Sequence, residues 1–162
     1  MTLPRTPSQT VGPFYSIGLS RAPQNELADP RDPAALRLIG VVVDGQGTPI
    51  PDGMVELWDP VGRRWGRSGT DSEGRFSFVV TKPGTFPGEA PRFDVLVFAR
   101  GLLKHELTRV YFPDDADANA ADPVLAGLDE TSRATLVAEA EDGALRFDIR
   151  MQGDGHTVFF AH

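Results

Sequence analysis

Short runs of β-branched and aromatic residues, each closed by a residue that turns the backbone, follow one another along this chain. Seven runs are bounded by Gly, Pro or Asp, namely Leu36–Val43, Met54–Trp58, Arg75–Val80, Phe93–Ala99, Leu107–Phe112, Leu145–Met151 and Thr157–Phe160. Runs of this length and composition are typical of β-strands. The spacing therefore predicts an all-β chain of about seven strands.

Two of these runs, Arg75–Val79 and Leu145–Met151, alternate apolar and polar residues. Alternation with a period of two places one face of a strand in a core and the other in water, as in the sheets of a sandwich. The segments between the runs supply the fixed or positive φ of tight turns, at Asp44–Gly47, Pro51–Gly53, Asp71–Gly74 and Lys82–Gly84. We therefore expect a β-sandwich.

One segment predicts a helix. Asp129 can cap the segment Ser132–Ala140, which carries good helix formers, and Gly143 ends it. We expect it to be a short surface helix between strands. The acidic stretch Asp114–Asp122 is interpreted as a solvated loop, because nothing in it fixes the spacing of metal ligands.

The first 35 residues differ from the rest, since they contain six prolines and little apolar periodicity. We expect an extended N-terminal arm at 1–35 and a single β-sandwich domain at 36–162. Within the arm, Val11–Leu19 is too aromatic and apolar to stay in water. The arm is therefore expected to dock on the domain or on a partner chain.

Charge and composition exclude several functions. The net charge of −7 opposes binding to nucleic acid, and the absence of cysteine excludes zinc–thiolate, iron–sulfur and thiol chemistry. No stretch approaches the roughly 18 apolar residues of a membrane span, and the first residues lack the apolar centre of a signal peptide. We therefore expect a soluble, cytoplasmic protein with neither a nucleic acid nor a membrane as partner.

The side chains that could carry chemistry are few. No pair of histidines has the short spacing of a metal site, and the hydroxyl groups lack an identifiable base. The histidines and tyrosines are His105, His156, His162, Tyr15 and Tyr111. One further candidate is Arg100, which ends an apolar strand before Gly101. An arginine at a strand end is usually only solvated, but this one is also suited to a bidentate pair with a carboxylate.

Eight segments occur in the order found in a known family. They are Thr6–Phe14, Val55–Trp58, Gly66–Asp71, Thr81–Gly84, Leu96–Gly101, Leu107–Phe112, Arg146–Arg150 and Gln152–Phe160. Together they resemble the intradiol ring-cleaving dioxygenases, over about residues 5 to 160. The segments Phe98–Gly101 and Thr157–Phe160 resemble the alpha chains of the protocatechuate-cleaving members.

The resemblance implies an intradiol-dioxygenase-like β-sandwich in a heteromer of alpha and beta subunits. It also implies that the partner beta subunit holds a non-haem Fe(III) by two tyrosinates and two histidines. The corresponding places here contain no Tyr in Asp59–Trp65, Phe86 in place of the second Tyr, and no His in Phe93–Val97. Since Fe(III) needs anionic oxygen donors, the resemblance implies no metal site on this chain. We expect apolar side chains to fill these places.

The resemblance further implies which residues touch substrate. The arm would reach the partner's iron site and line the substrate pocket, and the arginine would lie near the substrate's carboxylate. Tyr15 is included because relatives often carry Tyr directly after the Gly-Pro pair, where this chain has Phe14. The implied substrate-binding residues are Thr10, Gly12, Pro13, Phe14, Tyr15 and Arg100.

The implied reaction inserts both atoms of O2 into protocatechuate and gives 3-carboxy-cis,cis-muconate, in aromatic catabolism by the beta-ketoadipate pathway. No catalytic residue and no activity of the isolated chain are expected. Two alternatives stay open. A non-enzymatic, transthyretin-like binding module shares the turn and strand pattern of residues 40–57 but leaves the arm unexplained. A single-chain, iron-containing intradiol enzyme would need ligands that this sequence does not show.

Overall fold

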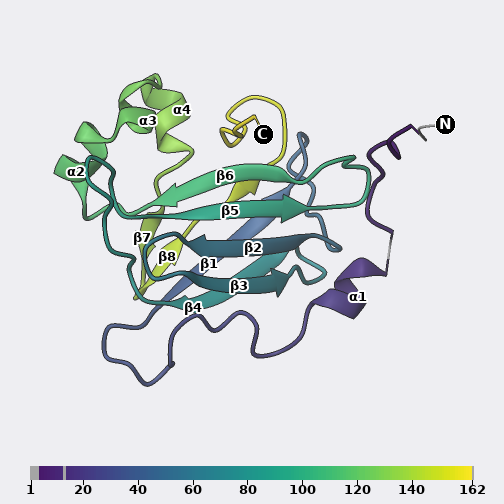
Figure 1. The fold of residues 1–162 in the computed structure, drawn as a ribbon, viewed down its shortest axis with the longest axis horizontal. Coiled ribbons are helices and arrows are strands. Elements are labelled where there is room, and N and C mark those ends of the chain that lie inside the picture. The colour runs from purple at the N-terminus through teal and green to yellow at the C-terminus, as the bar shows by residue number, and fades with distance from the viewer. Residues whose placement is uncertain (1–3, 13, 162) are drawn as a thin grey trace.

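Two β-sheets packed face to face form the body of the computed structural model, which describes residues 4–12 and 14–161 (Figure 1). The first sheet has the strand order β4-β1-β8-β7, and β9 also pairs with β1. Its strands are β1 (Leu36–Val43), β4 (Arg75–Val80), β7 (Glu139–Glu141), β8 (Ala144–Arg146) and β9 (Ile149–Arg150). Since β1 runs antiparallel to β4 and parallel to β8, this sheet is mixed.

The second sheet has the order β3-β2-β5-β6, and all its neighbours are antiparallel. Its strands are β2 (Met54–Asp59), β3 (Arg64–Gly69), β5 (Arg92–Phe98) and β6 (Glu106–Tyr111). Residues of β5 alternate between the core, where Phe93, Val95 and Val97 are buried, and an outer face that carries Asp94 and Leu96. The alternation thus decides which side chains of this sheet face outward.

The core lies between the sheets and is built from the inward residues of both. From the first sheet come Leu38, Val42, Phe76, Phe78 and Val80, and from the second Val55, Leu57, Phe93, Val95, Val97 and Val110. Burial of each large apolar side chain stabilises the fold by about 1.5–3 kcal/mol relative to exposure, which makes this layer the main source of stability. The predicted β-sandwich is confirmed.

Three short helices cover one end of the sandwich (Figure 1), and a fourth lies in the arm. The covering helices are α2 (Ala116–Ala121), α3 (Pro123–Ala126) and α4 (Glu130–Ala134), and the arm contains α1 (Tyr15–Leu19). Leu125 and Leu136 pack with the ring of Tyr111 into a second apolar cluster beneath them. Among the described residues, no helix has the length and apolar character needed to traverse a lipid bilayer.

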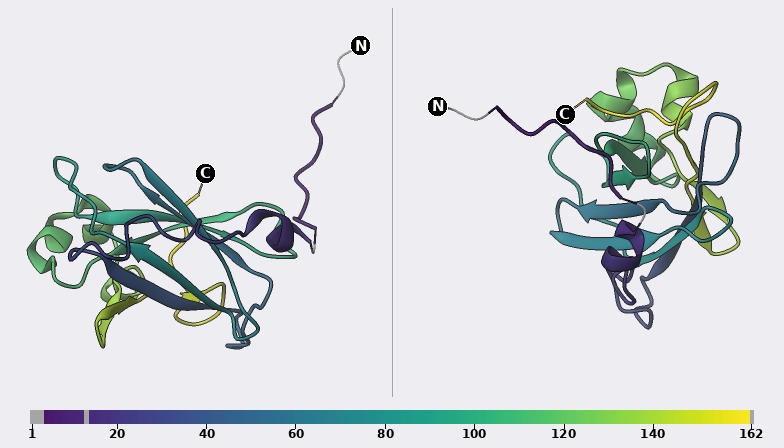
Figure 2. Two further views of the ribbon diagram at one scale, coloured as in Figure 1. Left: turned by 90° about the horizontal axis from the view of Figure 1, so that it is seen from below. Right: turned by 90° about the vertical axis from the view of Figure 1, so that its right-hand side faces the viewer.

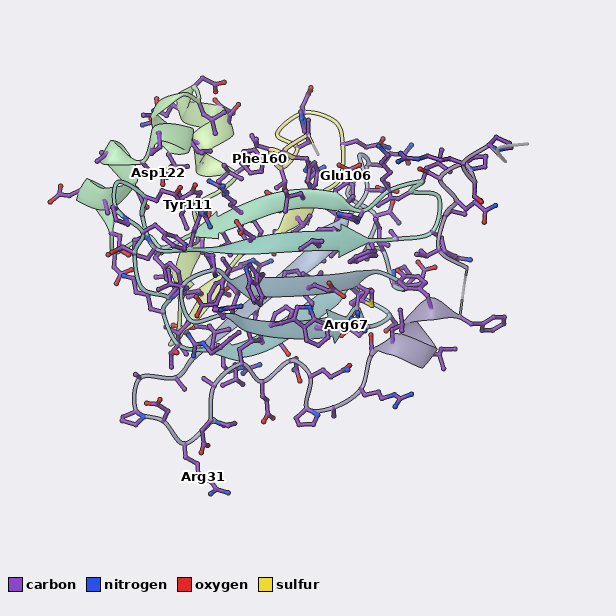
Figure 3. All side chains as sticks on the ribbon, in the orientation of Figure 1. Arg31, Arg67, Glu106, Tyr111, Asp122 and Phe160 are labelled. Atoms are coloured by element: carbon purple, nitrogen blue, oxygen red, sulfur yellow. The ribbon has the colours of Figure 1, made fainter. Side chains whose placement is uncertain are left out.

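Asp122 joins these helices to the second sheet (Figure 3). Its fully buried carboxylate accepts hydrogen bonds from the backbone N–H groups of Val124 at 2.9 Å, Leu125 at 3.2 Å and Ala90 at 3.0 Å. The hydroxyl of Tyr111 donates to the same carboxylate at 3.3 Å. The cap of α3 thus also fixes the chain before β5 and the end of β6.

The predicted helix at Ser132–Ala140 is wrong in extent. The structure ends α4 at Ala134, and residues from Glu139 form β7. The cause is tertiary pairing, because the carbonyl of Leu136 accepts from the N–H of Tyr111 and the N–H of Ala138 donates back to Tyr111. These bonds hold residues 136–138 extended against β6, so pairing overrides the local preference for helix.

Other boundaries also differ from the sequence prediction. The acidic stretch predicted as a loop contains α2, and β3 occupies a segment for which no strand was predicted. The run Leu145–Met151 divides into β8 and β9 around Phe147, whose carbonyl approaches Gly40 so closely that a Cβ there would lie 1.9 Å from it. The last run, Thr157–Phe160, contributes only a bridge from Phe160 to Leu107.

The N-terminal 35 residues do not behave as one element. Residues 24–28 pack between β3 and β4, where Gln24 accepts from the N–H of Arg67, Asn25 accepts from the N–H of Val79, and Leu27 enters the core. By contrast, residues 4–8 are exposed and lead away from the sandwich (Figure 2). Part of the arm therefore belongs to this chain's own fold, whereas docking of the remainder on a partner stays a prediction.

Candidate functional site

A hydrogen bond joins the projecting arm to the loop between β5 and β6. The hydroxyl of Thr10 accepts from the backbone N–H of Gly101 at 2.9 Å, across 91 positions of sequence. Gly101 has a φ of +90°, a left-handed conformation that favours glycine. The turn directs this N–H toward the arm and leaves the preceding residue, Arg100, beside it.

Tyr15 anchors the start of α1 to the sandwich. Its hydroxyl lies 2.5 Å from the carbonyl oxygen of Asp52 and 2.9 Å from that of Phe98, so one donor bridges the turn before β2 and the end of β5. The pKa of Tyr15 is raised to about 12: burial is the largest cause, the nearby Asp52 also raises it, and Arg100 partly offsets both. The hydroxyl therefore stays neutral at physiological pH and acts as a donor to the backbone.

Arg100 forms an ion pair with Asp52, made between Nε and Oδ2. The arginine side chain is 59% exposed, whereas that of Asp52 is 23% exposed. The guanidinium is thus held on one side by a more buried carboxylate and is open to solvent on the other.

The remaining arm residues face outward. The side chains of Phe14 and Ile17 are each 75% exposed, and a Cβ added at Gly12 would meet no atom within 4 Å. Packing against the described residues of this chain therefore does not explain a glycine at position 12 or aromatic surface at position 14. Pro13 lies outside the described residues, so its predicted contact stays a prediction.

A cavity of about 320 Å³ lies between the arm and the β5–β6 loop. Its walls are mostly apolar and include Gln9, Val11, Phe98, Leu102, Leu103 and His105. The ring of His105 stacks at 5.4 Å on that of Phe98. A larger groove, of about 1010 Å³, lies over β1, β4 and the end of β3 and is lined in part by Ser20, Arg21 and Ala22 of the arm. The smaller cavity, beside the arm, is the one that adjoins the predicted site.

The places predicted to have lost metal ligands carry both charged and apolar side chains. Asp94 on the outer face of β5 pairs with Arg92 at 3.0 Å and with Arg109 at 3.3 Å. At the start of the β2–β3 turn, the buried carboxylate of Asp59 accepts from both Nε and Nη2 of Arg64. The prediction of an apolar filling therefore does not hold at Asp59 and Asp94, which ion pairs satisfy, whereas Phe86 is apolar and 43% exposed.

The same places do not suit a ferric ion. Phe86 offers no donor atom, and the carboxylates of Asp59 and Asp94 are already paired with arginine. Within residues 4–12 and 14–161, no group of three or more His, Cys, Asp or Glu side chains is arranged to hold a metal ion. The residues present thus do not fit the family's metal.

Three of the residues predicted from the sequence, Thr10, Tyr15 and Arg100, come together at one end of the sandwich. Asp52 completes this cluster but was not predicted, since the sequence marks Pro51–Gly53 only as a turn. An acidic residue in a turn gives no sign of its distant partner. Only the pairing of β2 with β5, which sets Met54 opposite Phe98, brings Asp52 to the arginine.

Solved structures define the class of this fold. The dioxygenase domain of a carbohydrate-binding fusion protein from Streptomyces sp. SirexAA-E matches 91% of this chain and 98% of its own with a TM-score of 0.64, at 21% identity. An intradiol ring-cleavage dioxygenase from Tetranychus urticae matches 78% of this chain and 83% of its own, with a TM-score of 0.61 at 15% identity. The fold is therefore that of the intradiol dioxygenases.

Sequence relatives narrow the class, although no family model matches the chain. The protocatechuate 3,4-dioxygenase alpha chain of Burkholderia cepacia is 42% identical over 98% of both chains. That of Pseudomonas putida is 38% identical over 98% of this chain and 96% of its own. The chain belongs to the family of protocatechuate 3,4-dioxygenase alpha chains, and the resemblance predicted from its motifs is confirmed.

A homologous beta chain matches less well. The protocatechuate 3,4-dioxygenase beta chain of Burkholderia cepacia is 28% identical over 78% of this chain and 63% of its own length. Both kinds of chain are thus homologous to this protein, and the alpha chains are the more similar in sequence. A transthyretin-like module would account for residues 40–57 alone, whereas the alpha-chain relatives align with 98% of the chain.

Proposed function

We propose that this chain is the alpha subunit of a heteromeric protocatechuate 3,4-dioxygenase and forms one wall of its substrate pocket. The complex would cleave protocatechuate with O2 to 3-carboxy-cis,cis-muconate. The beta subunit would hold the Fe(III), since the residues of this chain do not fit that ion. The subunit division, the pathway and a cytoplasmic location are all parts of the proposal.

The observation that carries the proposal is the hydrogen bond between Thr10 and Gly101. It ties the arm to the residue that directly follows Arg100. A flexible arm alone could reach many surfaces, but an arm tied at this loop presents its backbone and the arginine to the same space. The two features that the sequence singled out would thus form one site.

Arg100 would hold the carboxylate of protocatechuate. A guanidinium stays charged at any relevant pH and offers donors in a planar fork that matches a carboxylate. Because the chain carries a net charge of −7, it does not attract an anion as a whole, so attraction must be local. The exposed side of this guanidinium can supply it.

The exposed apolar side chains of the arm would contact the beta subunit. Phe14 and Ile17 project from the same short segment, and Leu103 is 63% exposed on the neighbouring β5–β6 loop. Grouped apolar residues on a surface are typical of protein–protein contacts. Gly12, with open space around its Cα, would allow a second chain or the substrate ring to approach the backbone.

The test uses the complex of this chain with its beta chain, with protocatechuate and catechol compared as substrates. Arg100→Ala should lower kcat/KM for protocatechuate at least tenfold, the equivalent of about 1.4 kcal/mol, with a smaller change for catechol, which lacks the carboxylate. Arg31→Ala removes an exposed arginine at the far end of the arm and is the matched control (Figure 3). Equal losses for both substrates would contradict the contact with the carboxylate.

A further inference from the structure

We infer that Asp52 is a positioning residue that fixes the guanidinium of Arg100 in the orientation which receives a carboxylated substrate. The inference rests on the proposed function and adds a residue to it. Its basis is the ion pair between Asp52 Oδ2 and Arg100 Nε. Neither the turn motif around Asp52 nor the arm motif points to this residue.

Asp52 is itself held in place from two sides. Its carbonyl oxygen accepts from the Tyr15 hydroxyl at 2.5 Å. The N–H of the next residue, Gly53, donates to Thr70 Oγ1 at 2.8 Å, and that hydroxyl donates to the carbonyl of Ile50 at 2.7 Å. A carboxylate on such a restrained turn is a fixed reference point for a flexible partner.

The side chain of Arg100 would be mobile without such a contact. Its side chain is 59% exposed and lies on a loop, so an unpaired guanidinium would sample many rotamers and lose that freedom when it binds an anion. The contact with Asp52 is made through Nε, and among the described residues no hydrogen bond from Nη1 or Nη2 to the protein is seen. The pair therefore restrains the side chain while its outer nitrogens remain available to a second carboxylate.

The negative charge of Asp52 has an opposite effect, since it repels an anionic ligand. The two effects predict opposite changes in the affinity for carboxylated ligands when the carboxylate of Asp52 is removed. If positioning dominates, removal of the carboxylate weakens binding of carboxylated ligands. If competition for the guanidinium dominates, removal strengthens it. The partial burial of Asp52 and the contact at Nε favour positioning.

The experiment measures Asp52→Asn and Asp52→Ala in the complex with the beta chain. Asparagine keeps an oxygen that can accept from Nε, whereas alanine keeps none. We expect kcat/KM for protocatechuate to fall about threefold in the first variant and about tenfold in the second, with little change for catechol. Equilibrium binding of 4-hydroxybenzoate, which carries the carboxylate, should weaken in the same order of variants, whereas binding of phenol, which lacks it, should change little. Glu73→Gln, which removes the same charge from an exposed pair with Arg75, is the matched control and should change neither.

A double variant separates a positioning role from a general structural one. If Asp52 acts through the arginine, Asp52→Ala combined with Arg100→Ala should be no worse than Arg100→Ala alone. Losses that multiply would overturn the inference, as would tighter binding of carboxylated ligands by the Asp52 variants. If Arg100→Ala weakens binding of the carboxylated ligand selectively and the Asp52 variants do not, only the inference fails. If Arg100→Ala shows no selectivity, the substrate contact fails and the inference falls with it.

Discussion

The side chain of Leu27 occupies the space that a side chain at position 66 would need. A Cβ built on Gly66 would lie 2.1 Å from Leu27 Cδ1 and 2.9 Å from the carbonyl oxygen of Gln24. Leu27 is 9% exposed and belongs to the main core cluster. The glycine in β3 is therefore the reason that a residue of the N-terminal segment can reach the core.

This relationship predicts a compensating pair of substitutions. Gly66→Ala should destabilise the protein by about 1–3 kcal/mol through overpacking, and Leu27→Ala by about 2–3 kcal/mol through loss of burial. The double variant should lose less than the sum, because the shortened side chain makes room for the new methyl group. Urea unfolding of the four proteins measures the coupling, and strict additivity would show that the two positions are independent.

The buried carboxylate of Asp122 predicts a large effect from a small change. Asp122→Ala leaves the N–H groups of Ala90, Val124 and Leu125 without their acceptor, so we expect a loss of about 2–4 kcal/mol in the free energy of unfolding. Tyr111→Phe removes two long hydrogen bonds, one to this carboxylate at 3.3 Å and one from Arg109 at 3.4 Å, and should cost about 1 kcal/mol. Chemical denaturation measures the free energy of unfolding of both variants. Similar losses would contradict the expectation that the backbone acceptor role of Asp122 outweighs its bond to Tyr111.

Removal of the Tyr15 hydroxyl should release the arm but leave the sandwich intact. Tyr15→Phe deprives the carbonyls of Asp52 and Phe98 of their donor, at a cost of about 0.5–1.5 kcal/mol confined to this region. Limited proteolysis should then cut residues 4–19 faster, while the melting temperature stays close to that of the wild type. Unchanged cleavage would mean that other contacts hold α1.

Alkaline pH should have the same effect as that substitution. Burial raises the pKa of Tyr15 from 10.0 to about 12, so the folded state favours the protonated hydroxyl. A group whose pKa is raised on folding contributes its full stabilisation below the unfolded pKa and loses it as the pH rises through the folded value. Anchoring of the arm should thus weaken between pH 10 and pH 12. Phenolate absorbance of the wild type minus that of Tyr15→Phe measures this titration, and a midpoint near 10 would contradict the burial.

Fe(III) added to the isolated chain should produce no visible tyrosinate-to-iron absorption. The two tyrosines are engaged, Tyr15 with backbone carbonyls and Tyr111 with Asp122, and the places that correspond to the family's ligands carry Phe86 and paired carboxylates. Absorption spectra and iron analysis after gel filtration test this expectation. Stoichiometric iron with a visible band would contradict the assignment of the metal to the beta chain.

Much of the fold followed from local chemistry, because alternation and turn residues act over a few positions. The strands β1 and β4 begin and end where the sequence predicts them. The predicted helix at Ser132–Ala140 was wrong for the opposite reason, since the hydrogen bonds of Leu136 and Ala138 to Tyr111 depend on distant parts of the chain.

The candidate site also combines residues that local motifs predict with contacts that depend on distant parts of the chain. Thr10 and Arg100 were named from motifs, but the hydrogen bond to Gly101 and the contact with Asp52 depend on strand register. The charge around Asp94 was also missed: Arg92 is two positions before it on β5, but Arg109 becomes its neighbour only when β5 pairs with β6.

The segment 24–28 also affects how the free subunit behaves, because it lies against two edge strands. Strands β3 and β4 end their sheets, and an uncovered strand at that position can recruit the same strand of another molecule. Here Gln24, Asn25 and Leu27 occupy hydrogen-bonding groups of both strands. The segment therefore covers both edge strands at Arg67 and Val79, which hinders pairing with a second molecule there.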